Sequence, residues 1–571
     1  MIVLGIADNH DSGAAVMIHN GLVSAVNQER IDRVKSSAAF PWGAIDAALD
    51  AADVSAREVD RIVIGTSFTP SAPLRLFPER HEKAREGGQF SPLLHTYVAY
   101  QSALRATGLH TFDVDLSRQI LKRRLKARRF TTDQLELVDH HRAHAQAAYR
   151  TQGHPDALVF TVDAMGDGTT VTVSRGHNGQ LDTLYRESGF SAINAFYGRI
   201  TELLGFVANR HEGKVMGLAA RATPPDELLA HLRSKLRFVG PGFSRASMFR
   251  AERREDPFWR AVERFDREQI AAAAQQVLEE SVLGFVRHWI QQTDCHALAV
   301  AGGIFANVKL NQRIAALPEV ERIFVFPGMS DTGNSVGAAL MMQDLLEPGF
   351  LARGQHRLRD VYWGPQATDE EIEEELKLQN LPYEKLSEEQ IIERAAQAIA
   401  KGDVVGWFQG RMEFGPRALG NRSMVGRPTD ADINKTLNDR LERTEFMPFA
   451  PSALVEYADE LFVGVDKAAH PAEFMTVTFD VKPEWHARIP AVVHVDGTAR
   501  PQLVRQDTNP RYWKLIERYR QLSGIPVVLN TSFNVHEEPI VCGPEEGIRA
   551  LAEDRIDRLA IGNYWVQGTR P

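Results

Sequence analysis

Val3-Leu4-Gly5-Ile6-Ala7-Asp8, close to the start of the chain, is an apolar run that ends in an aspartate and indicates a buried strand. A short polar loop follows at residues 9–12, then the apolar stretch 14–18 and an Asn20-Gly21 pair. Asparagine and glycine tolerate the positive φ values of a tight hairpin. The stretch therefore predicts a strand, an aspartate at its end, a loop and a hairpin.

The same pattern returns much later in the chain. Leu158-Val159-Phe160-Thr161-Val162-Asp163 again ends in aspartate, and a glycine-containing loop at 164–168, an apolar stretch and an Asn178-Gly179 turn follow. Its double occurrence resembles the duplicated ribonuclease-H-like core of the superfamily of actin, heat-shock ATPases and sugar kinases. That resemblance implies two halves that face each other, with loops that bind nucleotide phosphates and metal.

Length and composition are those of an ordinary globular protein. At roughly 100–200 residues per domain, the 571 residues predict two to four units. We expect a domain boundary near residue 350, between a short Gly- and Arg-containing segment at 348–356 and an acidic, helix-forming run at 369–376. The remainder, 351–571, is interpreted as one α/β domain.

Several classes of protein are disfavoured. No apolar run approaches the ~20 residues that cross a bilayer, and the N-terminus lacks a basic n-region, so we expect a cytoplasmic protein without a membrane partner. Cys295 and Cys542 alone build neither a disulfide framework nor a zinc–thiolate site. The net charge of −9 disfavours a nucleic-acid partner and suits a cationic substrate.

An anion site is predicted in the C-terminal third. Residues 410–423, Gly-Arg-Met-Glu-Phe-Gly-Pro-Arg-Ala-Leu-Gly-Asn-Arg-Ser, follow an apolar run and contain three arginines and three glycines. Arginine forks match paired oxygens, and glycines let backbone N–H groups approach a ligand. An exposed basic turn is the alternative. A second donor-rich loop, residues 529–534, follows another apolar run, and two such loops at strand ends favour the anion pocket.

His140 and His144 lie in an alanine-rich stretch. In a helix they are one turn apart on one face and can hold one metal, although histidines at this spacing are often simple surface residues. Asp163 and Asp331 supply carboxylates, and such a mixed N/O site suits iron, manganese or zinc. His-Glu-x-x-His is missing, so a zinc protease is not indicated.

Two further segments suit a nucleotide. The apolar run 297–301 enters Gly302-Gly303, with Asn307 shortly after, and glycines at a strand end let the backbone approach a phosphate. Lys214, in the polar stretch 211–217, can neutralise phosphate charge. Taken singly, both segments would be ordinary turns or surface loops.

Together these segments resemble the NodU/CmcH-type O-carbamoyltransferase family, and the resemblance covers essentially the whole chain. The motifs, in order, are His10-Asp11-Ser12-Gly13-Ala14, His140-x-x-x-His144, His211-Glu212-Gly213-Lys214, Gly302-Gly303 with Asn307, Asp331-x-Gly333, residues 410–423, residues 494–502 and Asn530-Thr531-Ser532-Phe533-Asn534. One departure is Met447, where the family usually has an arginine. A phosphate contact from that position is therefore in doubt.

The resemblance implies a Kae-type domain at 1–350, of the actin-like ATPase superfamily, and a smaller YrdC-like α/β domain at 351–571. It also implies that carbamoyl phosphate and ATP, with Mg²⁺, form a carbamoyl-adenylate whose carbamoyl group passes to a hydroxyl of a small molecule. The acceptor we expect is an aminoglycoside such as tobramycin. The expected resident metal is divalent, with Fe(II) favoured. The sequence sets no oligomeric state.

The roles implied by the resemblance are hypotheses. His10 would be the general base for the acceptor hydroxyl, with a structural loop histidine as the alternative. Asp11 and Asp167 would contact amino groups of the acceptor, unless they only cap loops. The nucleotide ligands would be Lys214, Gly302, Gly303 and Asn307. The phosphate ligands would be Arg417, Arg422, Arg443, Asn530, Thr531 and Ser532. The metal ligands would be His140, His144, Asp163 and Asp331.

Two other functions stay open. A fused Kae-type and YrdC-like pair could make threonylcarbamoyl-adenylate for a transfer RNA, which would require a basic stripe and salt-sensitive binding. An actin-like ATP-driven switch that binds a protein partner is the non-enzymatic alternative. That alternative leaves residues 410–423 without a role.

Overall fold

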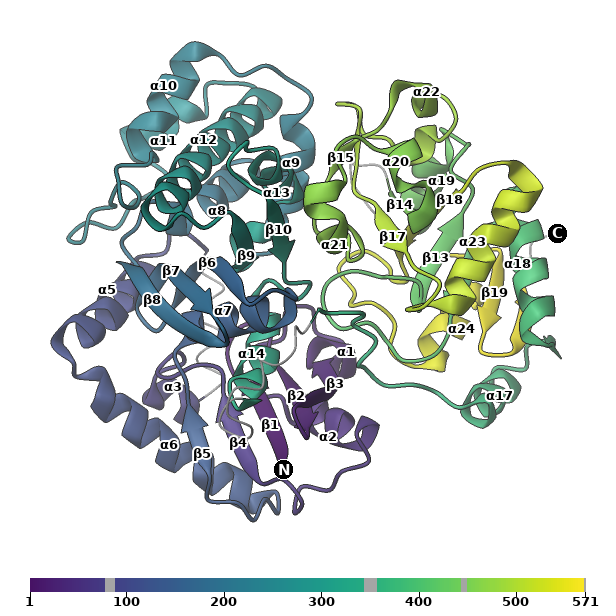
Figure 1. Ribbon diagram of the computed structural model, residues 1–571, viewed down its shortest axis with the longest axis horizontal. Coiled ribbons are helices and arrows are strands. Elements are labelled where there is room, and N and C mark those ends of the chain that lie inside the picture. Colours follow the sequence, from purple (N-terminus) through teal and green to yellow (C-terminus); the bar gives the residue numbers. More distant parts are fainter. Residues whose placement is uncertain (78–87, 344–356, 443–448, 569–571) are drawn as a thin grey trace.

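The first predicted strand lies at the centre of a five-stranded sheet in the computed structural model, which describes residues 1–77, 88–343, 357–442 and 449–568 (Figure 1). In spatial order the strands are β3 (Gly21–Asn27), β2 (Gly13–Ile18), β1 (Ile2–Ala7), β4 (Arg61–Ile64) and β5 (Leu135–Leu137). Strand β1 pairs antiparallel with β2 and parallel with β4. Five of its six residues are buried, so its apolar run forms sheet core.

A second sheet repeats this arrangement. Its strands, in spatial order, are β10 (Arg322–Val325), β9 (Ala297–Ala301), β6 (Asp156–Gly166), β7 (Thr169–His177) and β8 (Gln180–Ser188). Strand β6 pairs antiparallel with β7 and parallel with β9, as β1 does with β2 and β4. The repeated sequence pattern therefore corresponds to a repeated arrangement in space.

Two helices separate the sheets. Helix α14 (Asn334–Leu340) packs on β1 and β2, α7 (His140–Thr151) packs on β6 and β9, and the two helices pack on each other. Their contact is close: a Cβ on Gly337 would lie 1.9 Å from the carbonyl oxygen of Ala143. Only glycine fits there, and it brings the starts of both helices together.

The other helices cover the outer faces of the two sheets (Figure 1). Around the first sheet they are α1 (Glu29–Asp32), α2 (Trp42–Ala51), α3 (Ala72–Leu76), α5 (Pro92–Thr107) and α6 (His110–Ala127). Around the second they are α8 (Ile193–Leu203), α9 (Glu212–Ala219), α10 (Asp226–Lys235), α11 (Pro257–Val262), α12 (Arg267–Thr293) and α13 (Val308–Ala315).

The C-terminal domain is built on an eight-stranded mixed sheet. Its order is β11 (Tyr383–Lys385), β20 (Tyr564–Gln567), β19 (Arg558–Ile561), β12 (Val405–Phe408), β13 (Arg422–Gly426), β18 (Val527–Ser532), β14 (Ala450–Leu454) and β17 (Gln502–Val504). Its principal helices are α17 (Asp369–Leu378), α18 (Glu388–Lys401), α19 (Ile433–Arg440), α21 (Ala469–Ala472), α23 (Pro510–Ser523) and α24 (Pro544–Ala552). The acidic run at 369–376 forms α17, which Thr368 caps. The whole chain is thus α/β with mixed sheets.

The two domains are in direct contact. Arg33, just after α1, donates to the carbonyls of Pro539 and Ile540 at 2.8 and 2.9 Å. The boundary predicted near residue 350 lies outside the described residues. The first described residues beyond it still pack on the N-terminal domain, because Leu358 and Trp363 share a core with Val63 and Phe324.

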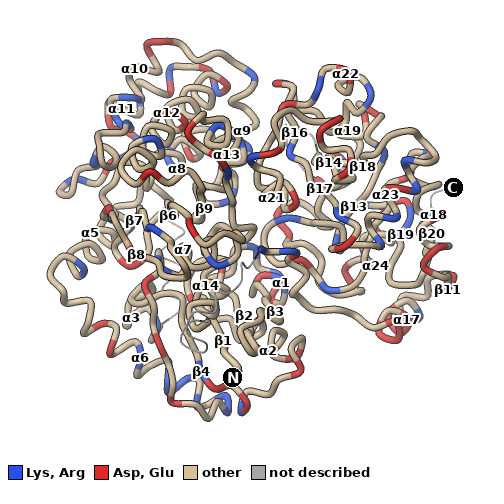
Figure 2. Tube along the Cα trace, viewed as in Figure 1, with Lys and Arg blue, Asp and Glu red and all other residues tan. Residues whose placement is uncertain are grey.

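Positively and negatively charged residues are interspersed along the trace of both domains (Figure 2). Residues 118–129, at the end of α6 and just after it, are rich in arginine, and Arg123, Arg128 and Arg129 are exposed to solvent. Among the described residues, no helix combines the length and the apolar character that crossing a bilayer requires.

Candidate metal centre and anion site

Helix α7 begins with the predicted histidine pair. Asp139 caps the helix by accepting the backbone N–H of Arg142 at 3.1 Å. His140 and His144 follow one turn apart, and both are fully buried, so the alternative of surface histidines is wrong. His141 points away from the pair, and its Nδ1 lies 2.6 Å from Thr161 Oγ1.

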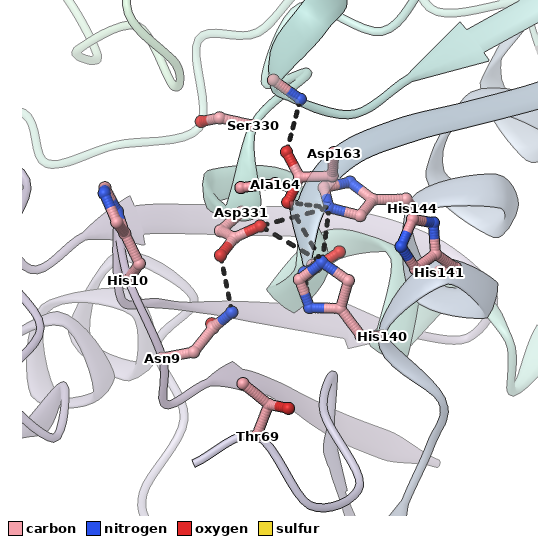
Figure 3. Close-up of polar contacts among 12 residues, drawn as sticks. Asn9, His10, Thr69, His140, His141, His144, Asp163, Ala164, Ser330 and Asp331 are labelled. Carbon is pink, nitrogen blue, oxygen red and sulfur yellow. Dashed lines mark hydrogen bonds and ion pairs between the residues drawn. The ribbon is translucent and has the colours of Figure 1, made fainter. Parts of the chain in front are cut away.

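Four side chains converge at this point (Figure 3). His140 Nε2 lies 3.1 Å from His144 Nε2, 3.3 Å from Asp331 Oδ1 and 3.4 Å from Asp163 Oδ2. His144 Nε2 lies 3.2 Å from Asp331 Oδ1 and 4.0 Å from Asp163 Oδ2. Asp163 comes from β6, and Asp331 begins the short helix η2 (Asp331–Gly333).

These spacings fit a shared cation. Ligand atoms about 2.1 Å from one ion lie about 3.0–3.4 Å apart in octahedral or tetrahedral geometry, which matches most of the distances found. Two imidazoles with two carboxylates suit iron, manganese or zinc. The four predicted residues therefore fit a divalent metal, and nothing in their arrangement selects one of the three.

The electrostatics of the cluster are strained without a cation. Burial lowers the pKa of His140, but Asp331 and Asp163 together raise it to about 9. Burial and the neighbouring His140 hold the pKa of His144 well below its ordinary value. Burial and Asp163 raise the pKa of Asp331 well above its usual range. A divalent cation would offset the repulsion between the two carboxylates.

Asn9 and Asn334, which sequence reasoning missed, and the backbone of Gly303 orient the ligands. Asn9 donates Nδ2 to Asp331 Oδ2 at 2.7 Å, and the backbone N–H of Gly303 donates to Asp163 Oδ1 at 2.7 Å. Asn334 Nδ2 lies 3.2 Å from His140 Nδ1, and Asn334 Oδ1 has no hydrogen-bond partner among the described residues. Turning this amide over lets its oxygen accept Nδ1–H and leaves Nε2 of His140 free to bind metal.

The first loop lies beside this cluster. His10 Nδ1 is 3.1 Å from Asp11 Oδ1, and Ser330 Oγ donates to Asp11 Oδ2 at 3.3 Å. Figure 3 shows Asp331 between His10 and the histidine pair. His10 and Asp11 thus lie at the edge of the site and are partly exposed.

Asp167 is not placed to meet an acceptor. Its side chain is fully buried and accepts the backbone N–H groups of Ser67, Phe68 and His140 at 2.8–2.9 Å. It organises the loop before α7, which was the alternative interpretation from the sequence. The expected contact with an amino group is therefore replaced by a loop-capping role.

The predicted nucleotide segment borders the same cluster. Gly302 has φ 104°, and a Cβ there would lie 2.2 Å from the carbonyl oxygen of Val162, so glycine is required. Asn307 caps α13 and exchanges hydrogen bonds with Gln275. Lys214, on α9, is buried with its Nζ 5.9 Å from the centre of the Phe206 ring.

The loop 410–423 is organised around a carboxylate of its own. Glu413 Oε1 accepts the backbone N–H groups of Leu419 and Asn421 at 2.7 Å and of Arg422 at 3.1 Å. These N–H groups, expected to face a ligand, face Glu413 instead. Arg417 projects from this loop and is partly exposed.

Five other phosphate ligands were predicted, and those that the structure describes have different environments. Arg422 is fully buried and donates to the carbonyls of Gln409 and Asn421 at 2.7 and 2.9 Å, so its role is to hold the loop. Asn530, Thr531 and Ser532 belong to strand β18 rather than a loop. Asn530 donates to Ala418 and Ser452. Arg443 and Met447 lie outside the described residues.

The solved structures that match this chain do so weakly. Component A of (R)-2-hydroxyglutaryl-CoA dehydratase from Acidaminococcus fermentans matches 61% of this chain and 99% of its own, with 13% identity and a TM-score of 0.34. A ROK family glucokinase from Streptomyces griseus, in complex with glucose and AMPPNP, matches 59% and 98%, with 13% identity and a TM-score of 0.29. These scores are too low to identify the fold.

Sequence relatives are more informative. Nodulation protein NolNO of Sinorhizobium fredii is 32% identical over 98% of this chain and 79% of its own length. Nodulation protein NolO of Bradyrhizobium diazoefficiens is 34% identical over 75% of this chain and 79% of its own. An uncharacterized protein of Synechocystis is 31% identical over 98% and 96%.

Family models match both domains. The carbamoyltransferase N-terminus matches residues 2–340, and the carbamoyltransferase C-terminus matches residues 396–568. Together they span most of the chain, which agrees with the motifs found in the sequence. The chain belongs to the carbamoyltransferase family of the NodU/CmcH type and is an O-carbamoyltransferase.

Proposed function

We propose that this enzyme uses ATP to convert carbamoyl phosphate into a carbamoyl-adenylate and transfers the carbamoyl group to a hydroxyl of a small molecule. The observation that supports it best is the convergence of His140, His144, Asp163 and Asp331 in the N-terminal domain of a carbamoyltransferase. An aminoglycoside such as tobramycin is the acceptor we favour, because the chain is acidic overall and Asp11 lies at the edge of the site.

In the proposed architecture the two domains carry out different steps of the reaction. Residues 1–350 would be a Kae-type domain with a duplicated ribonuclease-H-like core, and residues 351–571 a YrdC-like domain. The equal topology of the two N-terminal sheets supports the first assignment. In this scheme the adenylate forms in the C-terminal domain and is used in the N-terminal domain, after crossing their interface.

The chemistry explains why an adenylate is useful. A carbamate is a poor acyl donor, and a mixed anhydride with AMP provides a good leaving group. Carbamoyl-adenylate hydrolyses readily in water, so forming and using it within one enclosed protein avoids its loss. Mg²⁺ would accompany ATP and offset the charge of its phosphates.

Side chains already described would carry the steps. Arg417 would bind the phosphate of the donor, because its fork matches paired oxygens. Lys214, Gly302, Gly303 and Asn307 would hold the nucleotide. His10 would take the proton of the acceptor hydroxyl, and Asp11 would bind an ammonium group of the acceptor. A divalent metal on the His/Asp cluster, for which we favour Fe(II), would act as a Lewis acid.

The two alternatives have less support. A threonylcarbamoyl-type enzyme for transfer RNA would need a basic surface for RNA, whereas the chain carries a net charge of −9. An ATP-driven switch would not require residues 396–568, which match a carbamoyltransferase model.

The test is an incubation of the purified protein with ATP, carbamoyl phosphate, ferrous iron and tobramycin, followed by mass spectrometry of the products. Carbamoylated tobramycin is the expected result. AMP that forms only with carbamoyl phosphate, but without that product, would support the activation step and refute the acceptor. If a folded, metal-loaded protein forms no AMP that depends on carbamoyl phosphate, the proposed reaction is wrong. A switch would hydrolyse ATP without carbamoyl phosphate.

A further inference from the structure

A histidine with no role in the proposed reaction lies beside an aspartate in the C-terminal domain, and the side chain of that aspartate is 25% exposed. His494 Nδ1 lies 3.0 Å from Asp496 Oδ1 in the turn formed by residues 494–498. The same oxygen accepts Thr498 Oγ1 at 2.7 Å and the backbone N–H of Thr498 at 3.1 Å. Asp496 Oδ2 accepts Lys309 Nζ, from α13 of the N-terminal domain, at 3.0 Å. The aspartate is thereby fixed by four donors.

This environment keeps Asp496 ionised. Burial raises the pKa of its carboxyl, but hydrogen bonds from His494 and Thr498, together with Lys309, hold that pKa well below the ordinary range. A carboxylate can only accept hydrogen bonds, so the proton of a neutral His494 ring must be on Nδ1. The lone pair of the ring is then on Nε2.

That nitrogen has no protein partner. His494 Nε2 is buried and makes no hydrogen bond with any of the described residues. The whole side chain is 11% exposed. A buried polar atom without a partner is destabilising and unusual in a native protein, and it is explained when a substrate or a reacting group supplies the donor.

Strand β17 begins at Gln502, four residues after this turn, and enters the eight-stranded sheet at the edge where the loop 410–423 lies. Strand β17 runs parallel to β14, and the first residue of β14, Ala450, pairs with Asn530 near the end of β18. Gln502, the first residue of β17, donates to the carbonyl of Leu419 in the loop 410–423 at 2.8 Å. The segment that leads from His494 into β17 therefore reaches the same edge as Arg417.

We propose that His494 is the general base of the donor-activation step, with Asp496 as the residue that positions it. This inference rests on the proposed function. Forming carbamoyl-adenylate, phosphate and pyrophosphate from carbamoyl phosphate and ATP consumes one water. The water oxygen bonds to the carbamoyl carbon while the bond from that carbon to the phosphate oxygen breaks. One water proton goes to His494 Nε2 and the other to the leaving phosphate, which gives carbamate and hydrogen phosphate.

Lys309 gives this arrangement a link between the domains. It lies two residues after Asn307 in the predicted nucleotide segment, and its ammonium group contacts the aspartate that orients the base. A nucleotide held near Asn307 would thus lie close to the helix that contacts the Asp496 carboxylate. Lys309 is a second positioning residue.

The test measures phosphate released from carbamoyl phosphate in the presence of ATP by the full-length enzyme. For His494→Gln we expect kcat to fall by about 10²–10⁴-fold, the usual contribution of a general base, with KM for carbamoyl phosphate changed by less than about threefold. For His494→Gly we expect added imidazole to restore part of the rate. Asp496→Asn should also lower kcat and leave KM for carbamoyl phosphate close to that of the wild type.

His486→Gln is the matched control. Its ring lies next to the same turn, but Nε2 already bonds the carbonyl of Val481 at 2.8 Å, so its activity should stay close to that of the wild type. Thermal melting of each variant shows whether it is folded. A folded His494→Gln enzyme with the wild-type kcat, or a His494→Gly enzyme that imidazole does not restore, would overturn the role of His494. A wild-type enzyme that releases no phosphate would overturn the proposed function as well.

Discussion

Asn9 donates its amide N–H to the carboxylate of Asp331 at 2.7 Å, although 322 positions separate them in the chain. The other oxygen of Asp331 faces His140 and His144. Asn9 therefore fixes the rotation of a carboxylate that would bind metal. It also joins the loop after β1 to the segment that leads into α14.

Replacing Asn9 by Ala should weaken metal binding. We expect a 10–100-fold lower affinity, about the usual effect of losing a residue that orients a ligand. Competition with a chelator for Fe(II) measures it. Asn178→Ala, in an exposed hairpin turn, is the control and should bind the metal like the wild type. An unchanged affinity in Asn9→Ala would show that Asp331 keeps its orientation without Asn9.

Variants in the two domains should fail at different steps. Arg417→Ala should abolish adenylate formation, because it removes the guanidinium fork proposed to bind phosphate. His140→Ala should spare that step and block transfer to the acceptor. Exchange of pyrophosphate into ATP, dependent on carbamoyl phosphate, reports the first step, and mass spectrometry of tobramycin reports the second. Failure of both variants at one step would contradict this division between domains.

Arg422→Ala should differ from Arg417→Ala by losing stability. The guanidinium of Arg422 is buried and bonds carbonyls of the loop 410–423, while its carbon atom Cζ lies 3.6 Å from the centre of the Phe408 ring. Removing it leaves the buried carbonyl of Gln409 without a donor and takes one of two donors from that of Asn421, so we expect a loss of about 3–5 kcal/mol in the free energy of unfolding. Urea denaturation measures it. A loss below about 1 kcal/mol would contradict the structural role.

His470 should make the folded protein less stable at acidic pH. Burial and the nearby Arg357 lower the pKa of His470 to about 3, against an ordinary value of 6.5. The unfolded chain then binds a proton below pH 6.5 while the folded protein does not, so stability falls as the pH drops from 6.5 towards 3. At pH 5 the loss is about 2 kcal/mol relative to pH 7.

The variant His470→Gln isolates this effect. Glutamine can still donate to the carbonyl of Leu358, which His470 Nε2 contacts at 2.8 Å, but it does not titrate. Denaturation at pH 7 and pH 5 should show a smaller pH dependence in the variant than in the wild type. Equal dependence in both proteins would mean that His470 is protonated in the folded state. Other titrating groups are common to both and cancel in the comparison.

Local patterns in the sequence identified much of the fold. The apolar run before Asp8 and the corresponding run before Asp163 each lie in the central strand of a five-stranded sheet. Each central strand pairs antiparallel with one neighbour and parallel with the other. The spacing of His140 and His144 correctly placed both on one helix. These features depend on neighbours within one element, so periodicity and spacing are enough to find them.

Features set by distant contacts could not be found in that way. Asn9 and Asn334 are ordinary polar residues in the sequence, and only the packing of the two sheets places them beside the cluster. Glu413 accepts hydrogen bonds from backbone N–H groups that the sequence pattern predicted to bind a ligand. Asn530 looked like part of a loop because polar residues are rare in central strands, but Ala418, in the loop before β13, and Ser452, in β14, accept hydrogen bonds from its amide.

The His/Asp cluster draws its members from α7, β6 and η2, and Asn9, in the loop after β1, orients Asp331, so the complete site requires the two N-terminal sheets to be docked through α7 and α14. A cation held there binds the docked state alone and shifts the equilibrium away from opened chains. In a cell starved of that cation, opened chains become more frequent, and proteases cleave them. The amount of enzyme would then follow the supply of metal, which limited proteolysis with and without a chelator can reveal as faster cutting between the sheets.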